Sequence, residues 1–179
     1  MAITITPNWL TVFRIALIPS GVWALFHSPS NTWQCIAWLI YFTLGMTDIL
    51  DGHWARKSNR TTPLGAFLDP VADKALIGSA MISLAILERF PWWIVAVILT
   101  REIGITIFRL LVIRDGVIPA SKGGKIKTLT QNFGVSFYML PLPEILHPLR
   151  DTLMAVAVVL TIWTGIDYIV QWQRGRKRP

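Results

Sequence analysis

The residues with the clearest chemical potential are four aspartates that occur in two closely spaced pairs. Asp48 and Asp51 are three residues apart and Asp69 and Asp73 are four apart, so on helices each pair would project from one side. Four carboxylates gathered in a low dielectric would repel one another and largely protonate unless cations neutralised them. Oxygen ligands in this number suit Mg²⁺ or Mn²⁺, and two ions fit better than one. The spacing therefore predicts a centre for two divalent cations, of the kind that serves phosphoryl transfer.

Small and basic residues accompany the two aspartate pairs. Gly52 and Ala55 leave the segment beside the first pair without bulk, and Gly65 does the same ahead of the second, which would let a ligand approach the backbone closely. Arg56 adds a guanidinium that can grip a phosphate, although an anchor at a membrane surface is its alternative role. Helix capping or simple ion pairing by the aspartates would not need small residues at these offsets. The pattern therefore favours a site for a phosphorylated ligand.

The composition indicates an integral membrane protein. The 179 residues are 53% hydrophobic and 15% charged, include nine Trp and have a mean hydropathy of +0.51, which is outside the usual mix of a soluble domain. The net charge is +7, but the basic residues stand between and after apolar runs, which argues against nucleic acid and for anionic lipid and phosphorylated substrates. Cys35 is the only cysteine, so a disulfide framework and a thiol-based metal site are excluded.

Six apolar segments come close to the roughly 20 residues that a helix needs to cross a bilayer. We therefore predict an all-α integral membrane bundle of six transmembrane helices in a single domain over residues 1–179. The segments cover residues 9–26, 33–55, 70–87, 91–113, 126–146 and 149–172. The fifth is the weakest because Pro141 and Pro143 would break its end, and a re-entrant or kinked helix is the alternative there.

Lys and Arg alternate between the segments that connect the predicted helices. The second-to-third and fourth-to-fifth connections and the C-terminal tail are basic, whereas the other three connections hold one Lys or Arg or none. By the positive-inside rule both termini are cytoplasmic, and the chain is a multi-pass protein of the inner (plasma) membrane. Both aspartate pairs then lie near the cytoplasmic face, where water-soluble phosphorylated substrates are available.

The spacing of the aspartates and their neighbours resembles a known family motif. Residues 48–73 match the pattern D-x2-D-G-x2-A-R-x8-G-x3-D-x3-D of the CDP-alcohol phosphotransferase (phosphatidyltransferase) family at each fixed position and each gap. Three further stretches, at residues 7–14, 101–109 and 124–128, look like the bacterial members that make phosphatidylglycerophosphate. The resemblance covers nearly the whole chain and is most specific at residues 48–73.

The resemblance implies a phosphatidyl transfer from CDP-diacylglycerol to glycerol 3-phosphate, carried out by a homodimer of six-helix subunits. The motif aspartates would hold two divalent cations, and Asp73 would also act as the general base. The residues expected to bind the CDP moiety are Asn8, Asp48, Asp51, Gly52, Ala55, Arg56, Gly65 and Asp69. The residues expected to bind the acceptor phosphate are Arg101, Arg109, Lys125 and Lys127.

Several alternatives remain open at this point. The same chemistry could use inositol phosphate, serine or phosphatidylglycerol as acceptor, and a membrane prenyltransferase or a cation transporter would also place carboxylates in a membrane. Arg101 and Arg109 could instead pair with Glu102, and the two lysines could be loop anchors. Asn8 could be a helix cap, with Arg14 a further candidate near the nucleotide. Acyl-chain preference, the choice of metal, the dimer interface and the role of Asp167 are not determined by the sequence.

Overall fold

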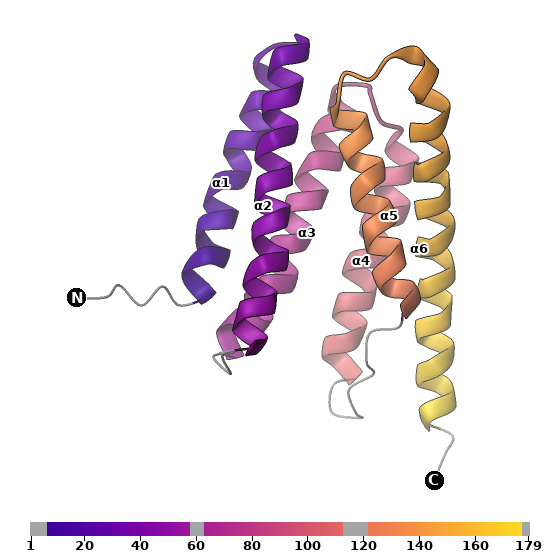
Figure 1. The fold of residues 1–179 in the computed structure, drawn as a ribbon. Coiled ribbons are helices and arrows are strands. Elements are labelled where there is room, and N and C mark those ends of the chain that lie inside the picture. Colours follow the sequence, from indigo (N-terminus) through magenta and orange to yellow (C-terminus); the bar gives the residue numbers. More distant parts are fainter. Residues whose placement is uncertain (1–6, 58–62, 113–121, 177–179) are drawn as a thin grey trace, which may run out of the picture. The chain divides into compact units, whose positions relative to one another are not determined.

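The computed structural model describes residues 7–57, 63–112 and 122–176. Over the helix segments at 7–10, 48–57, 63–67, 109–110, 112, 122, 125 and 175–176 it describes the backbone but not the side chains. The described residues form six α-helices and one short 3-10 turn and contain no strand, so the all-α prediction is confirmed (Figure 1). The helices are α1 (Pro7–His27), α2 (Asn31–Lys57), α3 (Pro63–Ile86), α4 (Trp92–Val112), α5 (Lys122–Met139) and α6 (His147–Arg176), with the turn η2 (Glu144–Leu146) before α6.

The helices overlap the six predicted apolar segments, and most of their ends lie within about four residues of the predicted ones, but two ends differ by more. The third helix begins at Pro63 rather than at residue 70, because proline is well tolerated in the first turn, where its missing N–H has no helical partner. The fifth predicted segment was wrong beyond Met139, where α5 stops and residues 140–143 form no helix. Pro141 and Pro143 lack the N–H that would continue the helix, which accounts for this ending.

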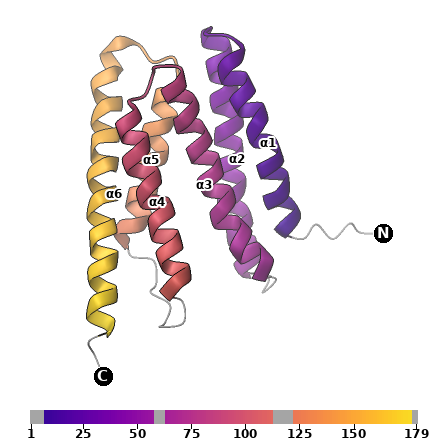
Figure 2. The same ribbon diagram turned by 180° about the vertical axis from the view of Figure 1, so that it is seen from behind.

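The chain divides into two compact units. Unit 1 comprises Met1–Arg89 with Met139–Pro141, and unit 2 comprises Phe90–Tyr138 with Leu142–Pro179. In unit 1, α1 packs against both α2 and α3 (Figures 1 and 2). The Tyr41 hydroxyl on α2 lies 3.1 Å from Ser79 Oγ on α3, and Gly21 on α1 lies against the Tyr41 ring. These contacts join the three helices around a core of small and aliphatic side chains.

The interior of unit 2 changes character along its helices. Its apolar part is lined by Ile94, Val95 and Ile98 of α4, Val135 and Tyr138 of α5, and Met154, Ala157 and Val158 of α6. Its polar part follows one or two turns further along α4 and α6 and earlier along α5, and consists of Arg101, Glu102, Lys127, Gln131, Thr161 and Thr164. Because α5 runs opposite to α4 and α6, the polar residues of the three helices fall at one level of the unit.

The C-terminus of α3 is closed by a Schellman motif. The Arg89 N–H donates to the Leu84 carbonyl at 2.9 Å, and the Glu88 N–H donates to the Ala85 carbonyl at 3.1 Å. This arrangement places the second residue after Ile86, the last residue of α3, in the left-handed region, and that residue, Glu88, has φ 57°. Glycine is the usual residue at such a position because a Cβ makes this conformation costly. The turn that follows α3 is therefore formed at some cost in backbone strain.

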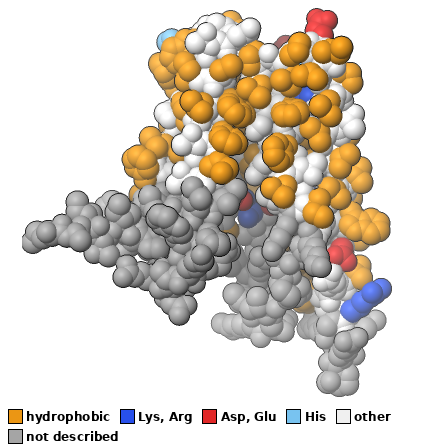
Figure 3. All heavy atoms as spheres, viewed as in Figure 1, with side chains coloured by type: hydrophobic (Ala, Val, Ile, Leu, Met, Phe, Trp, Pro, Cys, Tyr) orange, Lys and Arg blue, Asp and Glu red, His pale blue; other side chains and the backbone are white. Residues whose placement is uncertain are grey.

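Large apolar side chains lie exposed along every helix, as the orange side chains on the face in Figure 3 illustrate. Examples on each helix are Phe13, Leu39, Ile86, Ile107, Phe133 and Trp163. Among the described residues, the helix over Glu144–Arg174 has an 18-residue stretch of hydropathy 2.0 and is long and apolar enough to cross a membrane. The apolar helix over Thr11–His27 is shorter.

Candidate functional site

The second aspartate pair lies on consecutive turns of α3. Asp69 is exposed and Asp73 is half-buried. The Thr11 hydroxyl of α1 donates a hydrogen bond of 2.7 Å to Oδ1 of Asp69, and Thr11 is only 3% exposed. A buried hydroxyl therefore fixes one oxygen of an exposed carboxylate, and this orients the carboxylate of Asp69 relative to α1.

The backbone places the first aspartate pair and its neighbours at the same end of unit 1. Asp48, Asp51, Gly52, Ala55 and Arg56 all lie in the last turns of α2, Gly65 lies in the first turn of α3, and Asn8 lies in the first turn of α1. Their side chains are outside the described part of the structure. Only five residues separate the C-terminal end of α2 from the N-terminal end of α3. Figures 1 and 2 both show these two helix ends beside the N-terminus of α1. The motif residues thus gather where these three helix ends meet.

The described aspartates have the donor chemistry that a divalent cation requires. Asp69 and Asp73 present carboxylate oxygens four residues apart, and such hard oxygen ligands suit Mg²⁺ or Mn²⁺. Among the described side chains, which do not include Asp48 and Asp51, no group of three or more His, Cys, Asp or Glu residues could hold a metal ion. Asp69 and Asp73 are two of the four aspartates predicted to bind metal, and their chemistry suits that role.

Helix α1 contributes more to this end of unit 1 than the sequence analysis anticipated. Arg14 follows Thr11 by three residues, on the same side of α1, and is 2% exposed. The sequence indicates Asn8 and Arg14 as candidates near a nucleotide, whereas Thr11 was not among the predicted site residues. The available signal was the occurrence of two polar side chains at i, i+3 within an otherwise apolar run.

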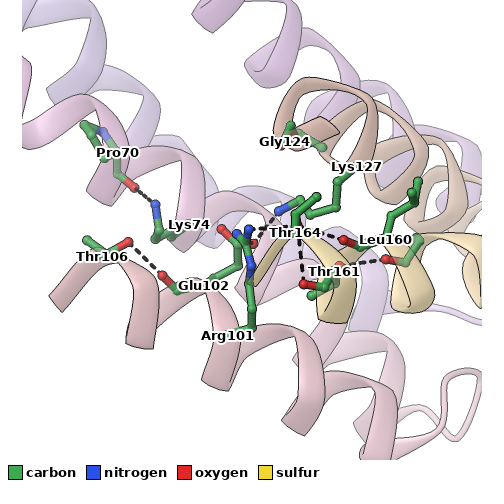
Figure 4. Close-up of polar contacts among 12 residues, drawn as sticks. Pro70, Lys74, Arg101, Glu102, Thr106, Gly124, Lys127, Leu160, Thr161 and Thr164 are labelled. Carbon is green, nitrogen blue, oxygen red and sulfur yellow. Dashed lines mark hydrogen bonds and ion pairs between the residues drawn. The ribbon is translucent and has the colours of Figure 1, made fainter. Parts of the chain in front are cut away.

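Unit 2 contains a connected group of charged side chains, which Figure 4 shows in close-up. Glu102 Oε1 accepts hydrogen bonds from Arg101 Nη1 at 3.0 Å and from Lys127 Nζ. Arg101 Nη2 also donates to the Thr164 hydroxyl at 2.9 Å, which ties α4 to α6. One carboxylate therefore holds an Arg of its own helix and a Lys of α5 together in the interior of unit 2.

These contacts bear on two questions that the sequence left open, the partner of Arg101 and the location of Lys127. The pairing of Arg101 with Glu102 is confirmed. The anchor role for Lys127 was wrong, because Lys127 lies inside α5 and is only 3% exposed. Whether Arg101 and Lys127 also bind an acceptor phosphate stays a prediction, and the side chains of Arg109 and Lys125 are outside the described part. The structure also gives Asp167 a partner, because Gln171 Nε2 donates to it at 2.7 Å along α6.

The two arrangements differ in the chemistry they could perform. The aspartates of unit 1 can hold cations and accept protons, whereas the Arg and Lys of unit 2 can bind an anion. Neither arrangement contains a nucleophilic thiol, since Cys35 lies elsewhere on α2 and is exposed.

Comparison with known proteins gives a consistent result. Residues 4–163 match the model of the family described as CDP-alcohol phosphatidyltransferase. The chain is 46% identical over 166 residues to a protein of Mycobacterium tuberculosis named "Probable phosphatidylglycerophosphate synthase", which covers 92% of this chain and 79% of that protein. Two further relatives are named CDP-diacylglycerol--glycerol-3-phosphate 3-phosphatidyltransferase. The protein of Bacillus subtilis is 35% identical, over 90% of this chain and 92% of its own length. The protein of Haemophilus influenzae is 37% identical, over 91% of this chain and 90% of its own length.

Proposed function

Because the chain belongs to the CDP-alcohol phosphatidyltransferase family, we propose that it transfers the phosphatidyl group of CDP-diacylglycerol to glycerol 3-phosphate. The products are phosphatidylglycerophosphate and CMP, an early step in the synthesis of phosphatidylglycerol. The names of relatives from three bacteria, each at least 35% identical over nine-tenths of this chain, carry the choice of acceptor. The aspartate motif at the helix ends of unit 1 carries the choice of chemistry.

The protein works as a multi-pass membrane enzyme in this proposal. Its helices of 18 to 30 residues have lengths of about 27 to 45 Å, comparable with the roughly 30 Å of a hydrocarbon core. The exposed apolar side chains along all six helices are what a lipid-facing surface requires. We place six spans in a single domain of the inner membrane, with both termini and the aspartates on the cytoplasmic side, and a homodimer as the assembly.

Four aspartates would hold two divalent cations, Mg²⁺ or Mn²⁺, as cofactors. Asp69 and Asp73 of α3 and Asp48 and Asp51 of α2 would be the ligands. When bound, the cations neutralise the negative charge of the pyrophosphate of the donor. Thr11 holds Asp69 in one orientation through its hydrogen bond, so that a single carboxylate geometry is available to a ligand.

The reaction itself is a substitution at phosphorus. Asp73 accepts the proton of the primary hydroxyl of the acceptor, and the oxygen of that hydroxyl forms a bond to the phosphorus that carries diacylglycerol. The bond between this phosphorus and the oxygen of CMP breaks, and CMP leaves with the electron pair. Arg56 binds the phosphate of the departing nucleotide through its guanidinium. Asn8, Gly52, Ala55 and Gly65 complete the nucleotide site, where the small residues allow close approach of the ligand.

The acceptor carries a phosphate of its own, which requires cations other than the metal ions. Arg101 and Lys127 meet this need in unit 2, together with Arg109 and Lys125. Glu102 holds Arg101 and Lys127 next to each other and offsets part of their mutual repulsion in the interior. The two side chains are thereby presented as a pair before the substrate arrives.

An acceptor assay tests the function directly. Purified protein in detergent is given CDP-diacylglycerol and Mg²⁺ or Mn²⁺ with glycerol 3-phosphate, inositol phosphate, serine or phosphatidylglycerol, and CMP and the lipid product are measured. We expect CMP release with glycerol 3-phosphate that depends on both the acceptor and the metal. Activity confined to another acceptor would change the substrate while leaving the chemistry intact, and the absence of CMP release with every acceptor would contradict the chemistry.

A further inference from the structure

In the polar part of the interior of unit 2, two buried side-chain atoms have no hydrogen-bond partner among the described residues. Gln131 lies on α5 one turn after Lys127 and is 2% exposed, and its Oε1 has no hydrogen-bond partner among the described residues. The Nε atom of Arg101 on α4 is likewise buried without a partner in this part of the chain. Leaving a buried polar atom unsatisfied costs roughly 1 to 3 kcal/mol, so each such atom calls for a physical explanation, and a bound ligand is one.

The two unused atoms are of opposite kinds. Arg101 Nε can only donate a hydrogen bond, whereas the amide oxygen of Gln131 can only accept one. The guanidinium of Arg101 and the ammonium of Lys127 suit the oxygens of a phosphate. A phosphate dianion cannot satisfy Gln131, because it has no proton to donate. A ligand that carries both an anion and a hydroxyl would satisfy both atoms.

The position of Gln131 fits a ligand with these two groups on neighbouring carbons. Residues at i and i+4 of a helix lie about 5 to 6 Å apart at their Cβ atoms, so Gln131 is the next side chain along the buried face from Lys127. In glycerol 3-phosphate the C2 hydroxyl stands on the carbon adjacent to the phosphorylated one. The C1 hydroxyl is consumed in the reaction, which leaves the C2 hydroxyl for recognition.

We infer that Gln131 recognises the C2 hydroxyl of the phosphorylated acceptor while Lys127 and Arg101 bind its phosphate. This inference rests on the proposed function and assigns a residue that the sequence motif does not contain. Because the C2 carbon is the chiral centre of glycerol 3-phosphate, the same contact selects the enantiomer of the acceptor.

A comparison of two acceptors with matched variants tests the inference. The acceptors are glycerol 3-phosphate and 3-hydroxypropyl phosphate, which keeps the primary hydroxyl and the phosphate but lacks the C2 hydroxyl. The variant Gln131→Met keeps the length and flexibility of the side chain and removes its polar atoms. Gln131→Asn keeps the amide but withdraws it by one methylene. Asn132→Leu changes the neighbouring exposed residue of α5 and is the control.

We expect Gln131→Met to lower kcat/KM for glycerol 3-phosphate roughly tenfold and to leave kcat/KM for 3-hydroxypropyl phosphate within about twofold of wild type. The loss should be mainly in the KM of the acceptor, with the KM of CDP-diacylglycerol unchanged. Gln131→Asn should show an intermediate loss with glycerol 3-phosphate, and Asn132→Leu none. Gln131→Met should also reduce the preference for sn-glycerol 3-phosphate over sn-glycerol 1-phosphate.

Other outcomes would overturn the inference. If Gln131→Met and Gln131→Asn lower kcat/KM equally for both acceptors, the residue has a structural role, for example through a buried water that bridges it to the helices. If neither acceptor is affected, Gln131 has no contact with the ligand. Thermal unfolding of each variant in detergent separates loss of fold from loss of recognition, and Gln131→Asn provides the comparison if Gln131→Met does not fold. Wild-type protein that is inactive with glycerol 3-phosphate contradicts the proposed function, and the inference about Gln131 then fails with it.

Discussion

The hydroxyl of Thr11 on α1 donates a 2.7 Å hydrogen bond to Oδ1 of Asp69 on α3, across 58 residues of sequence. This bond connects a buried position in the first helix to an exposed carboxylate of the aspartate motif. Residues that hydrogen-bond to metal ligands commonly change metal affinity by 10- to 100-fold when they are replaced. The relationship therefore yields a prediction that can be checked without catalysis.

We predict that Thr11→Val weakens the binding of Mn²⁺ to the protein by roughly tenfold. Valine has the shape of threonine but cannot donate to Asp69, so the carboxylate loses its fixed orientation. The measurement is a titration of the purified protein with Mn²⁺, followed by electron paramagnetic resonance of the free ion in the absence of substrate. Thr11→Ser should retain near wild-type affinity because it keeps the hydroxyl.

The control for this experiment is Ser20→Ala, also on α1. The Ser20 hydroxyl donates to the Leu17 carbonyl within the same helix, so its loss should leave Mn²⁺ binding unchanged. Equal Mn²⁺ affinity of Thr11→Val and wild type would show that the hydrogen bond does not orient Asp69 for a cation.

We predict that Asp73→Asn reduces kcat by at least about a hundredfold while CDP-diacylglycerol binding stays measurable. The amide resembles the carboxylate in size but cannot accept the proton of the acceptor hydroxyl, and general bases contribute about 10²- to 10⁴-fold to rates. The matched control is Asp167→Asn on α6, where the carboxylate accepts a hydrogen bond from Gln171. Turnover by Asp73→Asn close to that of Asp167→Asn would remove Asp73 as the base.

We predict that Gly21→Ala destabilises unit 1. A Cβ at Gly21 would lie 2.8 Å from Cε2 of the Tyr41 ring, and a rigid ring that hydrogen-bonds with Ser79 has little room to move. Overpacking of this kind costs about 1 to 3 kcal/mol of unfolding free energy. Gly45→Ala is the control on α2, because nothing lies within 4 Å of its Cβ position. In thermal unfolding, a melting temperature of Gly21→Ala at or above that of Gly45→Ala would contradict the close approach of α1 to α2.

We predict that Glu88→Gly raises the stability of the protein. Glu88 has φ 57° in the turn that closes α3, and glycine adopts this conformation without the penalty of a Cβ. The gain is reduced by the greater freedom of glycine in the unfolded chain, so we expect a net increase of about 0.5 to 1 kcal/mol. Glu144→Gly, in the exposed turn before α6, is the control and should not be stabilising. A lower melting temperature for Glu88→Gly than for wild type would contradict the argument from strain.

The helices could be predicted from the sequence because their apolar runs are long and separated by clear breaks. The start of α3 could not, since residues 63–69 combine a proline, a glycine and an aspartate that resemble a connection when read locally. The backbone of the structure nevertheless continues the helix through these residues, because α3 begins at Pro63. The end of α5 was misplaced for the opposite reason, because apolar residues continue past the point at which proline stops the backbone hydrogen bonds.

Spacing along one helix is enough to predict which residues share a face, and this part of the candidate site could be proposed from the sequence. The separations within the aspartate pairs gave the shared faces directly, whereas Thr11 was missed because its partner is distant in sequence. A loop anchor was one of two alternatives for Lys127 because the connections at this face are rich in basic residues, yet Lys127 lies inside α5. Gln131 carried no local signal at all, since its importance depends on burial and on the absence of a partner within the described residues.

The two compact units of the chain separate the two proposed binding functions. The residues proposed to bind the lipid nucleotide belong to the first three helices, and those proposed to bind the incoming alcohol belong to the last three. Mutations in α4 to α6 should then change which alcohol the enzyme accepts, while the nucleotide site in α1 to α3 stays the same. Chimaeras joined near Arg89 and Phe90, between family members that use different alcohols, would inherit their product from the C-terminal parent.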